Sequence, residues 1–262
     1  MLLAVLPASV IPGADGTLLG AAGRILIAGN GPELRTIQDL GAAFERANPG
    51  AVVEIEWQRN VKAVEMVKEG SADVAIAGQA DPELDATPIA WDGIAIVVNF
   101  SNPITQLTSA QVRSVLTGEV RFWSEFGGPE TRIELIHRPP DRNIRAGLEQ
   151  SLGISGVSSA PGKSTRSDQR VLSNVAGDLS AIAYVSLGQA LDAFHYGMPV
   201  RPLLIDGVEA AEPTVKSGQY KLRRPILLLF EKAPNPTRSA FIDFSLSSQG
   251  QRIIDENYIP NK

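Results

Sequence analysis

The segment RILIAGNGPELRTIQDLGAAFERAN, residues 24–48, predicts a strand, a tight turn and an amphipathic helix. Residues 24–28 form an apolar run that is too short for a helix and rich in branched side chains, which favours a strand buried on both faces. Gly29 and Gly31 permit positive φ, and Pro32 suits a first helical turn. Residues 48–50, Asn-Pro-Gly, end the helix. Its apolar residues recur at helical spacing: Leu34, Ile37, Leu40 and Phe44.

A strand that enters a helix through a glycine turn brings several unpaired backbone N–H groups to one point. The positive end of the helix dipole lies behind them. This arrangement is typical of an anion or polar-ligand site. The same pattern occurs at ordinary strand–helix corners of α/β folds, so both interpretations stay open at this point.

The next fifty residues repeat the strand–helix pattern. Residues 51–57 and 74–78 are predicted strands, and residues 61–69 are a short predicted helix between them. Such a βαβαβ unit predicts a parallel sheet, and open sheets of this kind bind ligands beyond the carboxyl ends of their strands. Three polar loops are therefore expected at one edge of the sheet: Gly29-Asn30-Gly31, Gln58-Arg59-Asn60 and Gly78-Gln79.

Composition excludes several classes of function. The chain has 262 residues and a net charge of −5, without a basic run, so a nucleic-acid surface is not expected. It has no cysteine, which excludes disulfides, thiolate metal sites, a cysteine nucleophile and a lipoprotein anchor. Its two histidines, His137 and His195, lie far apart in sequence, and a multi-histidine metal site is not expected.

The first twelve residues, MLLAVLPASVIP, are apolar but too short to span a bilayer as a stable anchor. They resemble the hydrophobic region of a secretory signal, although the usual positive residues before it are missing. We expect residues 1–22 to be a signal or disordered segment and the protein to be periplasmic, secreted and not a lipoprotein. A loosely docked tail is the alternative.

The rest of the chain contains a series of distinctive segments: PIAWDGIAIVVN (88–99), SNP (101–103), LTG (116–118), WSEFGG (123–128), AIAYVSLG (181–188), VKSGQY (215–220) with RP (224–225), FIDF (241–244) and SQGQ (248–251). Together these segments resemble the phosphate-binding proteins of bacterial phosphate ABC importers. The resemblance runs in family order from about Arg24 to Pro260.

This resemblance implies an α/β, two-lobed periplasmic-binding-protein fold that closes like a clamshell on a ligand in the cleft. Each lobe would be a mainly parallel sheet flanked by helices. The strands near residues 95 and 225 would cross between the lobes. The implied boundaries are 23–96 with 222–262 for lobe I and 97–221 for lobe II.

The sequence departs from the family where phosphate is held. The first loop of the family usually carries hydroxyl side chains, but Pro32 and Glu33 stand there, and Glu33 brings a negative charge. The family's Gly/Ser-rich second loop is replaced by residues 58–62, and the Ser–Asp pair after the third strand by Gly78-Gln79. At the fourth position Arg138 is kept, but Ser-Gly-Thr becomes Arg142-Asn143-Ile144.

Arginines can restore an anion site, because a guanidinium fork suits an oxyanion or a carboxylate. The alternative is that these arginines form surface or inter-lobe salt bridges with Glu33 and Asp141. The candidate ligand-binding residues are Gly29, Asn30, Gly31, Glu33, Arg59, Asn60, Gly78, Gln79, Arg138, Asp141, Arg142, Asn143 and Arg145.

The expected function is a solute-binding protein that captures phosphate or a related small anion for an ABC permease, acting as a monomer without cofactor, metal or nucleic acid. The alternative is a sensor on the same fold that binds another ligand and partners a membrane receptor. An enzyme is not expected, because no Gly-x-Ser-x-Gly elbow is present. The segment APGKST (160–165) ends like a phosphate-binding loop, but Val157 stands where the first glycine is required.

Overall fold

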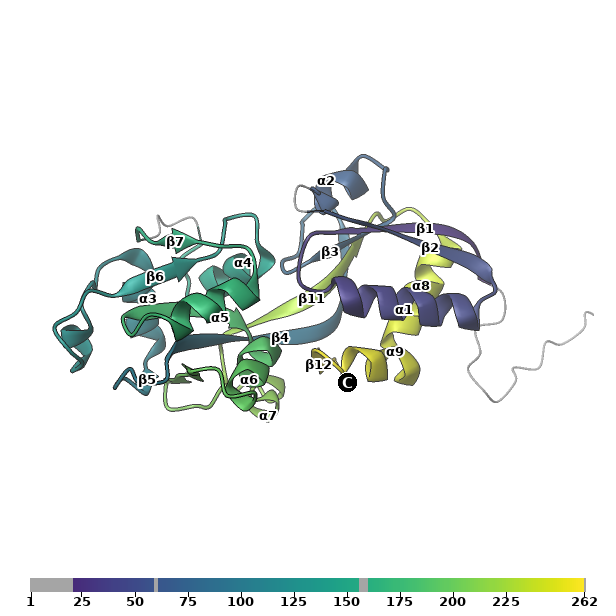
Figure 1. The fold of residues 1–262 in the computed structure, drawn as a ribbon. Coiled ribbons are helices and arrows are strands. Elements are labelled where there is room, and N and C mark those ends of the chain that lie inside the picture. Colours follow the sequence, from purple (N-terminus) through teal and green to yellow (C-terminus); the bar gives the residue numbers. More distant parts are fainter. Residues whose placement is uncertain (1–20, 59–60, 156–159, 262) are drawn as a thin grey trace, which may run out of the picture.

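The computed structural model describes residues 21–58, 61–155 and 160–261. Two lobes lie side by side and are joined by long strands that run from one into the other (Figure 1). The described N-terminal residues and the C-terminus belong to the same lobe, which we call lobe I. Residues 1–20, on which the signal prediction depends, lie outside the described part of the chain.

Lobe I is built on the predicted βαβαβ unit. Its elements are β1 (Ala22–Gly29), α1 (Leu34–Ala47), β2 (Gly50–Trp57), α2 (Ala63–Lys68) and β3 (Val74–Ala77). Strand β1 pairs in parallel with both β2 and β3, which confirms the predicted parallel arrangement. Helices α8 (Pro236–Leu246) and α9 (Ser248–Ile254) pack with α1, and Phe44 of α1 makes edge contacts with Phe241 and Phe244 of α8.

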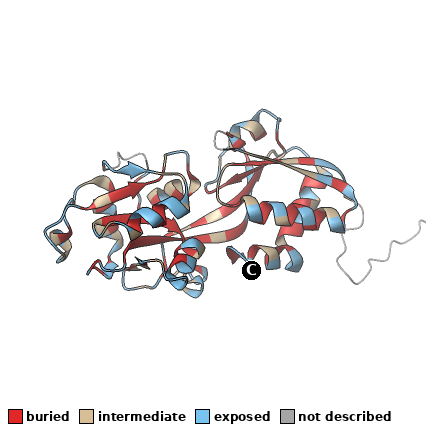
Figure 2. Cartoon of the chain, viewed as in Figure 1, coloured by how far each residue is buried: buried red, intermediate tan, exposed pale blue. Residues whose placement is uncertain are grey.

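Strands β4 (Asp85–Asn99) and β11 (Arg223–Phe230) connect the lobes as an antiparallel pair. Their register shifts between Ile226 and Leu227, and such a bulge bends a strand locally. The prediction that the strands near residues 95 and 225 cross between the lobes is confirmed. Both strands are buried along most of their length, so the connection is a packed sheet and not an exposed linker (Figure 2).

Lobe II continues the sheet in the order β4-β8-β6-β7. Strands β8 and β7 are parallel to β6, whereas β4 is antiparallel to β8. The elements of this lobe are β5 (Gln106–Leu107), α3 (Ser109–Thr117), a 3-10 turn (Trp123–Phe126), β6 (Glu134–His137), α4 (Asn143–Ser151), β7 (Lys163–Ser164), α5 (Asp168–Ala176), β8 (Ala181–Ser186), α6 (Leu187–His195), β9 (Val200–Pro202), β10 (Leu204–Ile205) and α7 (Glu212–Lys216). The last strand, β12 (Ile259–Pro260), pairs with β4.

The apolar side chains form separate cores. The core of lobe II surrounds Trp123 and Tyr184, and the main core of lobe I surrounds Phe44 and Phe241. The predicted α/β class and two-lobed architecture are therefore confirmed, while the exact lobe boundaries stay a prediction. Among the described residues, no helix has both the length and the apolar composition that crossing a bilayer requires.

Candidate ligand site at the junction of the lobes

The predicted loops of lobe I meet lobe II at the start of α4. A Cβ added to Gly78, which follows β3, would lie 3.1 Å from Cβ of Asn143 in α4. The side chain of Gln79 donates a hydrogen bond to the carbonyl of Ala146, 3.2 Å away. Arg142 donates a short hydrogen bond from Nη1 to the carbonyl of Asn30, which follows β1. The structure thus brings these residues together, as predicted, whereas Arg59 and Asn60 lie outside its described part.

Close approach is what requires the glycines of the first loop. A Cβ on Gly29 would overlap the ring of Trp57, and one on Gly31 would overlap the carboxylate of Glu33. Neither glycine has positive φ, so the turn does not use the left-handed conformations that glycine permits. Helix α1 begins at Leu34, and Trp57 donates from Nε1 to the carbonyl of Gly31, 3.0 Å away, which holds the loop against β2.

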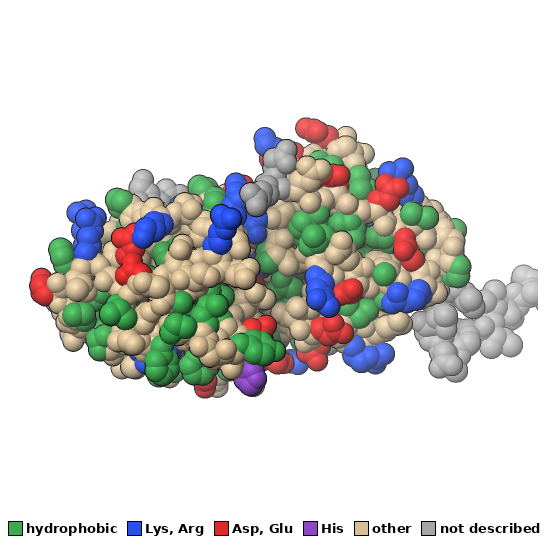
Figure 3. Space-filling view, viewed as in Figure 1, with side chains coloured by type: hydrophobic (Ala, Val, Ile, Leu, Met, Phe, Trp, Pro, Cys, Tyr) green, Lys and Arg blue, Asp and Glu red, His purple; other side chains and the backbone are tan. Residues whose placement is uncertain are grey.

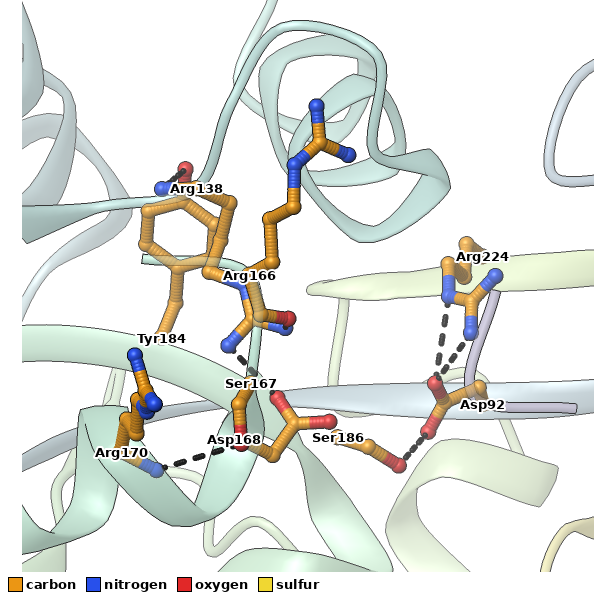
Figure 4. Close-up of polar contacts among 9 residues, drawn as sticks. All are labelled: Asp92, Arg138, Arg166, Ser167, Asp168, Arg170, Tyr184, Ser186 and Arg224. Carbon is orange, nitrogen blue, oxygen red and sulfur yellow. Dashed lines mark hydrogen bonds and ion pairs between the residues drawn. The ribbon is translucent and has the colours of Figure 1, made fainter. Parts of the chain in front are cut away.

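Arg138 follows β6 and is 1% exposed. Its backbone N–H donates to the hydroxyl of Tyr184, and its Nη2 donates to the carbonyl of Arg166. Its Nη1 lies 2.9 Å from Oδ1 of Asp168, at the start of α5 (Figure 4). Burial raises the pKa of Asp168, and the charge of Arg138 opposes that rise. The Nε atom of Arg138 is buried with neither a hydrogen bond nor an ion pair among the described residues.

Arg142, just before α4, is buried without a carboxylate at ion-pair distance among the described residues. Burial lowers its pKa, and the neighbouring charge of Arg138 lowers it further. The charges of Glu33 and Asp168 act in the opposite direction. Arg142 is therefore a buried cation whose nearest negative charges come from both lobes.

A second buried charge cluster lies where β4 and β11 cross the junction. Arg224 donates from Nε and Nη2 to Oδ2 of Asp92, at 3.1 and 2.8 Å, and Ser186 donates to Oδ1 of Asp92 at 2.7 Å (Figure 4). Oε1 of Glu33 lies 2.7 Å from Nη2 of Arg224. Burial alone would lower the pKa of Arg224, but the charges of Glu33 and Asp92 outweigh it and raise this pKa.

Two predicted residues lie at the edge of this site. Asp141 forms an ion pair with Arg166, 2.6 Å long and partly exposed. Arg145 contacts Glu149 through Nε at 2.7 Å and donates from Nη1 to the carbonyl of Arg138 at 3.0 Å. For the described arginines, the predicted alternative of pairing with Glu33 and Asp141 is wrong, because Glu33 pairs with Arg224 and Asp141 with Arg166. Arg59 lies outside the described residues.

Sequence reasoning missed four residues of the site: Asp92, Asp168, Ser186 and Arg224. A signal for two of them was present, because Asp92 and Arg224 are charged residues inside apolar strands, and a buried charge needs a partner. Asp168 and Ser186 have no such signal, since each lies at an ordinary helix start.

Two open grooves flank the charge cluster. One, of about 610 Å³, lies on the α2 side, and its lining includes two basic residues, Lys62 and Arg166, and two acidic residues, Glu65 and Asp141. The other, of about 590 Å³, lies on the side of α6 and α9 and is lined by many carboxylates: Asp92, Asp168, Asp192, Glu212, Asp255 and Glu256. Figure 3 shows Lys and Arg side chains on the upper side of the junction, and both acidic and basic side chains on its lower side. The groove on the α2 side has fewer carboxylates and is therefore the more favourable approach for an anion.

Comparison with known proteins supports the motif-based resemblance. A family model described as "PBP superfamily domain" matches residues 17–249. Phosphate-binding protein PstS of Bacillus subtilis is 23% identical over 250 residues, which cover 92% of this chain and 81% of that protein.

Solved structures agree with these sequence matches. An ABC-type phosphate transport receptor from Vibrio cholerae superposes with a TM-score of 0.79 and 25% identity, covering 91% of this chain and all of that one. A putative phosphate ABC transporter substrate-binding protein from Clostridium perfringens, solved with bound phosphate, gives a TM-score of 0.75 and 26% identity, covering 92% of this chain and all of that one. The predicted resemblance to phosphate-binding proteins is confirmed.

Proposed function

The chain belongs to the PBP superfamily, and on that premise we propose that it is an extracytoplasmic solute-binding protein that captures phosphate or a related small oxyanion between its lobes for an ABC importer. The observation that carries the proposal is the pair of buried arginines, Arg138 and Arg142, beside the N-terminus of α4. They lie at the point where Arg142 reaches the first loop of lobe I.

The chemistry of this junction suits an oxyanion. Helices α1 and α4 both begin here, one from each lobe, and helix N-termini favour negative charge through their free N–H groups and dipoles. Arg138 retains one buried nitrogen, Nε, that has neither a hydrogen bond nor an ion pair among the described residues. An unmet donor of a buried guanidinium costs free energy until an acceptor reaches it. An oxyanion can accept such bonds from two sides, which supports binding between the lobes.

We assign no catalytic role to the site. Ser186, a buried serine that could be considered a nucleophile, donates to Asp92. The ring of His137 contacts the carbonyl of Ala160, 2.5 Å away, so its Nε2 is occupied by that bond.

We further propose that the protein is periplasmic, is not lipid-anchored, acts as a monomer and works with an ABC permease. Its lobes would be bounded at residues 96/97 and 221/222.

Calorimetric titration of the full chain with inorganic phosphate at neutral pH tests this function. We expect micromolar or tighter binding. Arg138→Ala and Arg142→Ala are each expected to weaken it at least tenfold, because each removes a buried cation, and lost charged hydrogen bonds cost about 1.5–3 kcal/mol.

Arg113→Ala is the matched control, since Arg113 lies exposed on α3 of the same lobe. Its affinity should equal that of the wild type, and circular dichroism verifies the fold of each variant. Absence of binding to phosphate, sulfate and methylphosphonate at millimolar concentration would reject the proposed function.

A further inference from the structure

The carboxylate of Glu33 lies where a bound anion is expected. Glu33 directly precedes α1, at the positive end of that helix, and is 1% exposed. Its Oε2 lies over Gly31, in the space that a Cβ at that position would fill. Its Oε1 lies 2.7 Å from Nη2 of Arg224. An internal carboxylate thus occupies the end of the helix that a ligand oxyanion would otherwise approach.

This carboxylate differs from the other acidic group of the cluster in its hydrogen bonding. Asp92 accepts bonds from Nε and Nη2 of Arg224 and from the hydroxyl of Ser186. Glu33 has one polar contact, between its Oε1 and Nη2 of Arg224, whereas its Oε2 is buried without a hydrogen-bond partner among the described residues. Since Arg224 already has a two-bond partner in Asp92, it does not need Glu33 for neutralisation. A buried carboxylate oxygen without a donor is costly, so Glu33 is held by fewer bonds than Asp92 is.

The negative charge of Glu33 balances the positive charge of Arg142. Arg142 has no carboxylate at ion-pair distance among the described residues. Burial and the charge of Arg138 lower the pKa of Arg142, and the negative charge of Glu33 acts in the opposite direction. The remaining buried charges near the junction already form ion pairs: Arg138 with Asp168, and Arg224 with Asp92. Among the described buried charges of the junction, the cluster without a ligand is therefore neutral only if Glu33 is counted.

We propose that Glu33 determines the affinity of the site as a resident counter-ion, and that an oxyanion binds by displacing its carboxylate from Arg224 and taking over its charge opposite Arg142. This inference rests on the proposed function. It predicts that the wild-type chain binds phosphate more weakly than the arginine cluster alone permits, because the ligand must compete with a group already in place.

Glu33→Gln tests the inference, because it keeps the shape of the side chain and removes its charge. Calorimetric titration of the full chain with inorganic phosphate is expected to show at least tenfold tighter binding for Glu33→Gln than for the wild type. The matched control is Glu69→Gln, an exposed residue next to α2 in the same lobe with the same change of net charge. Its affinity should stay within twofold of the wild type.

The possible results separate the inference from the function. Equal affinity of Glu33→Gln and wild type, or weaker binding by Glu33→Gln, overturns the role of Glu33 and leaves the proposed function standing. No binding of phosphate, sulfate or methylphosphonate by either protein overturns the function and the inference with it. Phosphate binding by Glu33→Gln alone supports the inference and shows that phosphate is not the ligand of the wild-type site.

A crystal structure of the wild-type chain with arsenate tests the inference without any substitution. Arsenic is located by its anomalous scattering. We expect arsenate next to Arg142, with the carboxylate of Glu33 moved away from Arg224. Arsenate bound elsewhere in the cleft, with the contact between Glu33 and Arg224 intact, would overturn the displacement.

Discussion

At the scale of single residues, the buried carboxylate of Asp92 is stabilised by its hydrogen bonds to Ser186 and Arg224. Its carboxylate is 2% exposed, and burial raises its pKa while the charge of Arg224 lowers it. Ser186 and Arg224 approach its two oxygens from different strands, β8 and β11. Because the carboxylate has no access to water, each of these bonds replaces a bond to solvent.

Ser186→Ala tests how much the bond between Ser186 and Asp92 contributes to the free energy of unfolding. The substitution leaves one oxygen of a buried carboxylate without its donor, so we expect the free energy of unfolding to fall by about 1–3 kcal/mol. Urea denaturation measures this change. Ser245→Ala is the control: Ser245 is equally buried, but its hydroxyl donates to the carbonyl of Phe241 within a helix. A loss for Ser186→Ala no larger than for Ser245→Ala would contradict the role given to Asp92.

His137 makes stability depend on pH. Burial is the main cause of the lowered pKa of His137, although its bond to the carbonyl of Ala160 acts against it. A histidine whose folded pKa lies below its unfolded value of about 6.5 stays neutral in the folded state while the unfolded chain takes up a proton. Stability should therefore be constant above about pH 6.5 and fall as the pH decreases below it.

His137→Gln is expected to remove this part of the acid dependence. Thermal unfolding of both proteins between pH 5 and pH 8 measures it, and the difference between them should change on the acid side alone. His195→Gln is the control, because His195 lies exposed at the end of α6. Parallel curves for His137→Gln and wild type over the whole range would show that the ring is not buried neutral.

At this scale, what can be predicted from the sequence depends on how many residues separate two side chains that contact each other. Arg138 was identifiable because it aligns with an arginine of the family, although the residues after it differ. The pair of Asp92 and Arg224 joins residues 132 positions apart, and a pattern read along the sequence contains nothing that matches one to the other. Glu33 was recognised as a charge that opposes an anion, but its partner was not, since Arg224 reaches it only when β11 lies beside β4.

At the scale of elements, the sequence was informative wherever an element carries its own pattern. Helix α1 was predicted from apolar spacing. Helix α3 has a start signal of its own, because Thr108 and Gln111 form a capping box. Strands β5, β10 and β12 were not predicted. Each has two residues and exists because a partner strand lies beside it, as β10 lies beside β5 and β12 beside β4. Such strands have no periodicity of their own.

The corner between α8 and α9 depends on Gly250. A Cβ at this position would lie 2.8 Å from the backbone Cα of Ser245 and closer still to the carbonyl of Phe244. Backbone atoms cannot move aside as a flexible side chain does. We therefore expect Gly250→Ala to lower the free energy of unfolding by more than about 2 kcal/mol.

Gly177→Ala is the matched substitution. Gly177 follows α5 with φ −92°, and an added Cβ would find its nearest atom at 3.5 Å, an ordinary contact. It should be neutral or should stabilise the protein by about 0.4–1 kcal/mol. Guanidinium denaturation of both variants measures the contrast. Equal effects would show that the α8–α9 corner relaxes around the new side chain.

At the scale of the whole molecule, two lobes share one sheet. The long apolar strands near residues 95 and 225 made this architecture predictable, because they interrupt the pattern of short strands and helices. The arrangement of charge at the junction was not predictable, since the cluster combines side chains from β4, β11 and the ends of β1, β6 and β8. Local sequence patterns therefore predict most of the fold, whereas most of the site depends on contacts between residues that are far apart in the sequence.

Hydrogen bonds across the junction hold the lobes together without a ligand. Arg142 of lobe II bonds to Asn30, and Gln79 of lobe I bonds to Ala146. Each such bond contributes about 0.5–1.5 kcal/mol net, and a bond from a charged donor about 1.5–3 kcal/mol. Loss of the Arg142 bond should therefore shift the population toward separated lobes. The bulge between Ile226 and Leu227 marks the place on β11 where we expect the sheet to bend.

Electron paramagnetic resonance distances measure this shift directly, because the chain has no native cysteine to interfere with labelling. Spin labels at Glu69→Cys and Glu119→Cys report on opposite lobes from exposed positions. Without phosphate, Arg142→Ala should give a longer and broader distance distribution than the otherwise wild-type labelled protein. A label pair at Glu119→Cys and Asp192→Cys, both exposed in lobe II, should give the same distribution in both proteins. Since removal of Arg142 breaks one of the bonds that join the lobes and leaves each core intact, identical inter-lobe distances would show that the sheet of β4 and β11 alone fixes the angle between them.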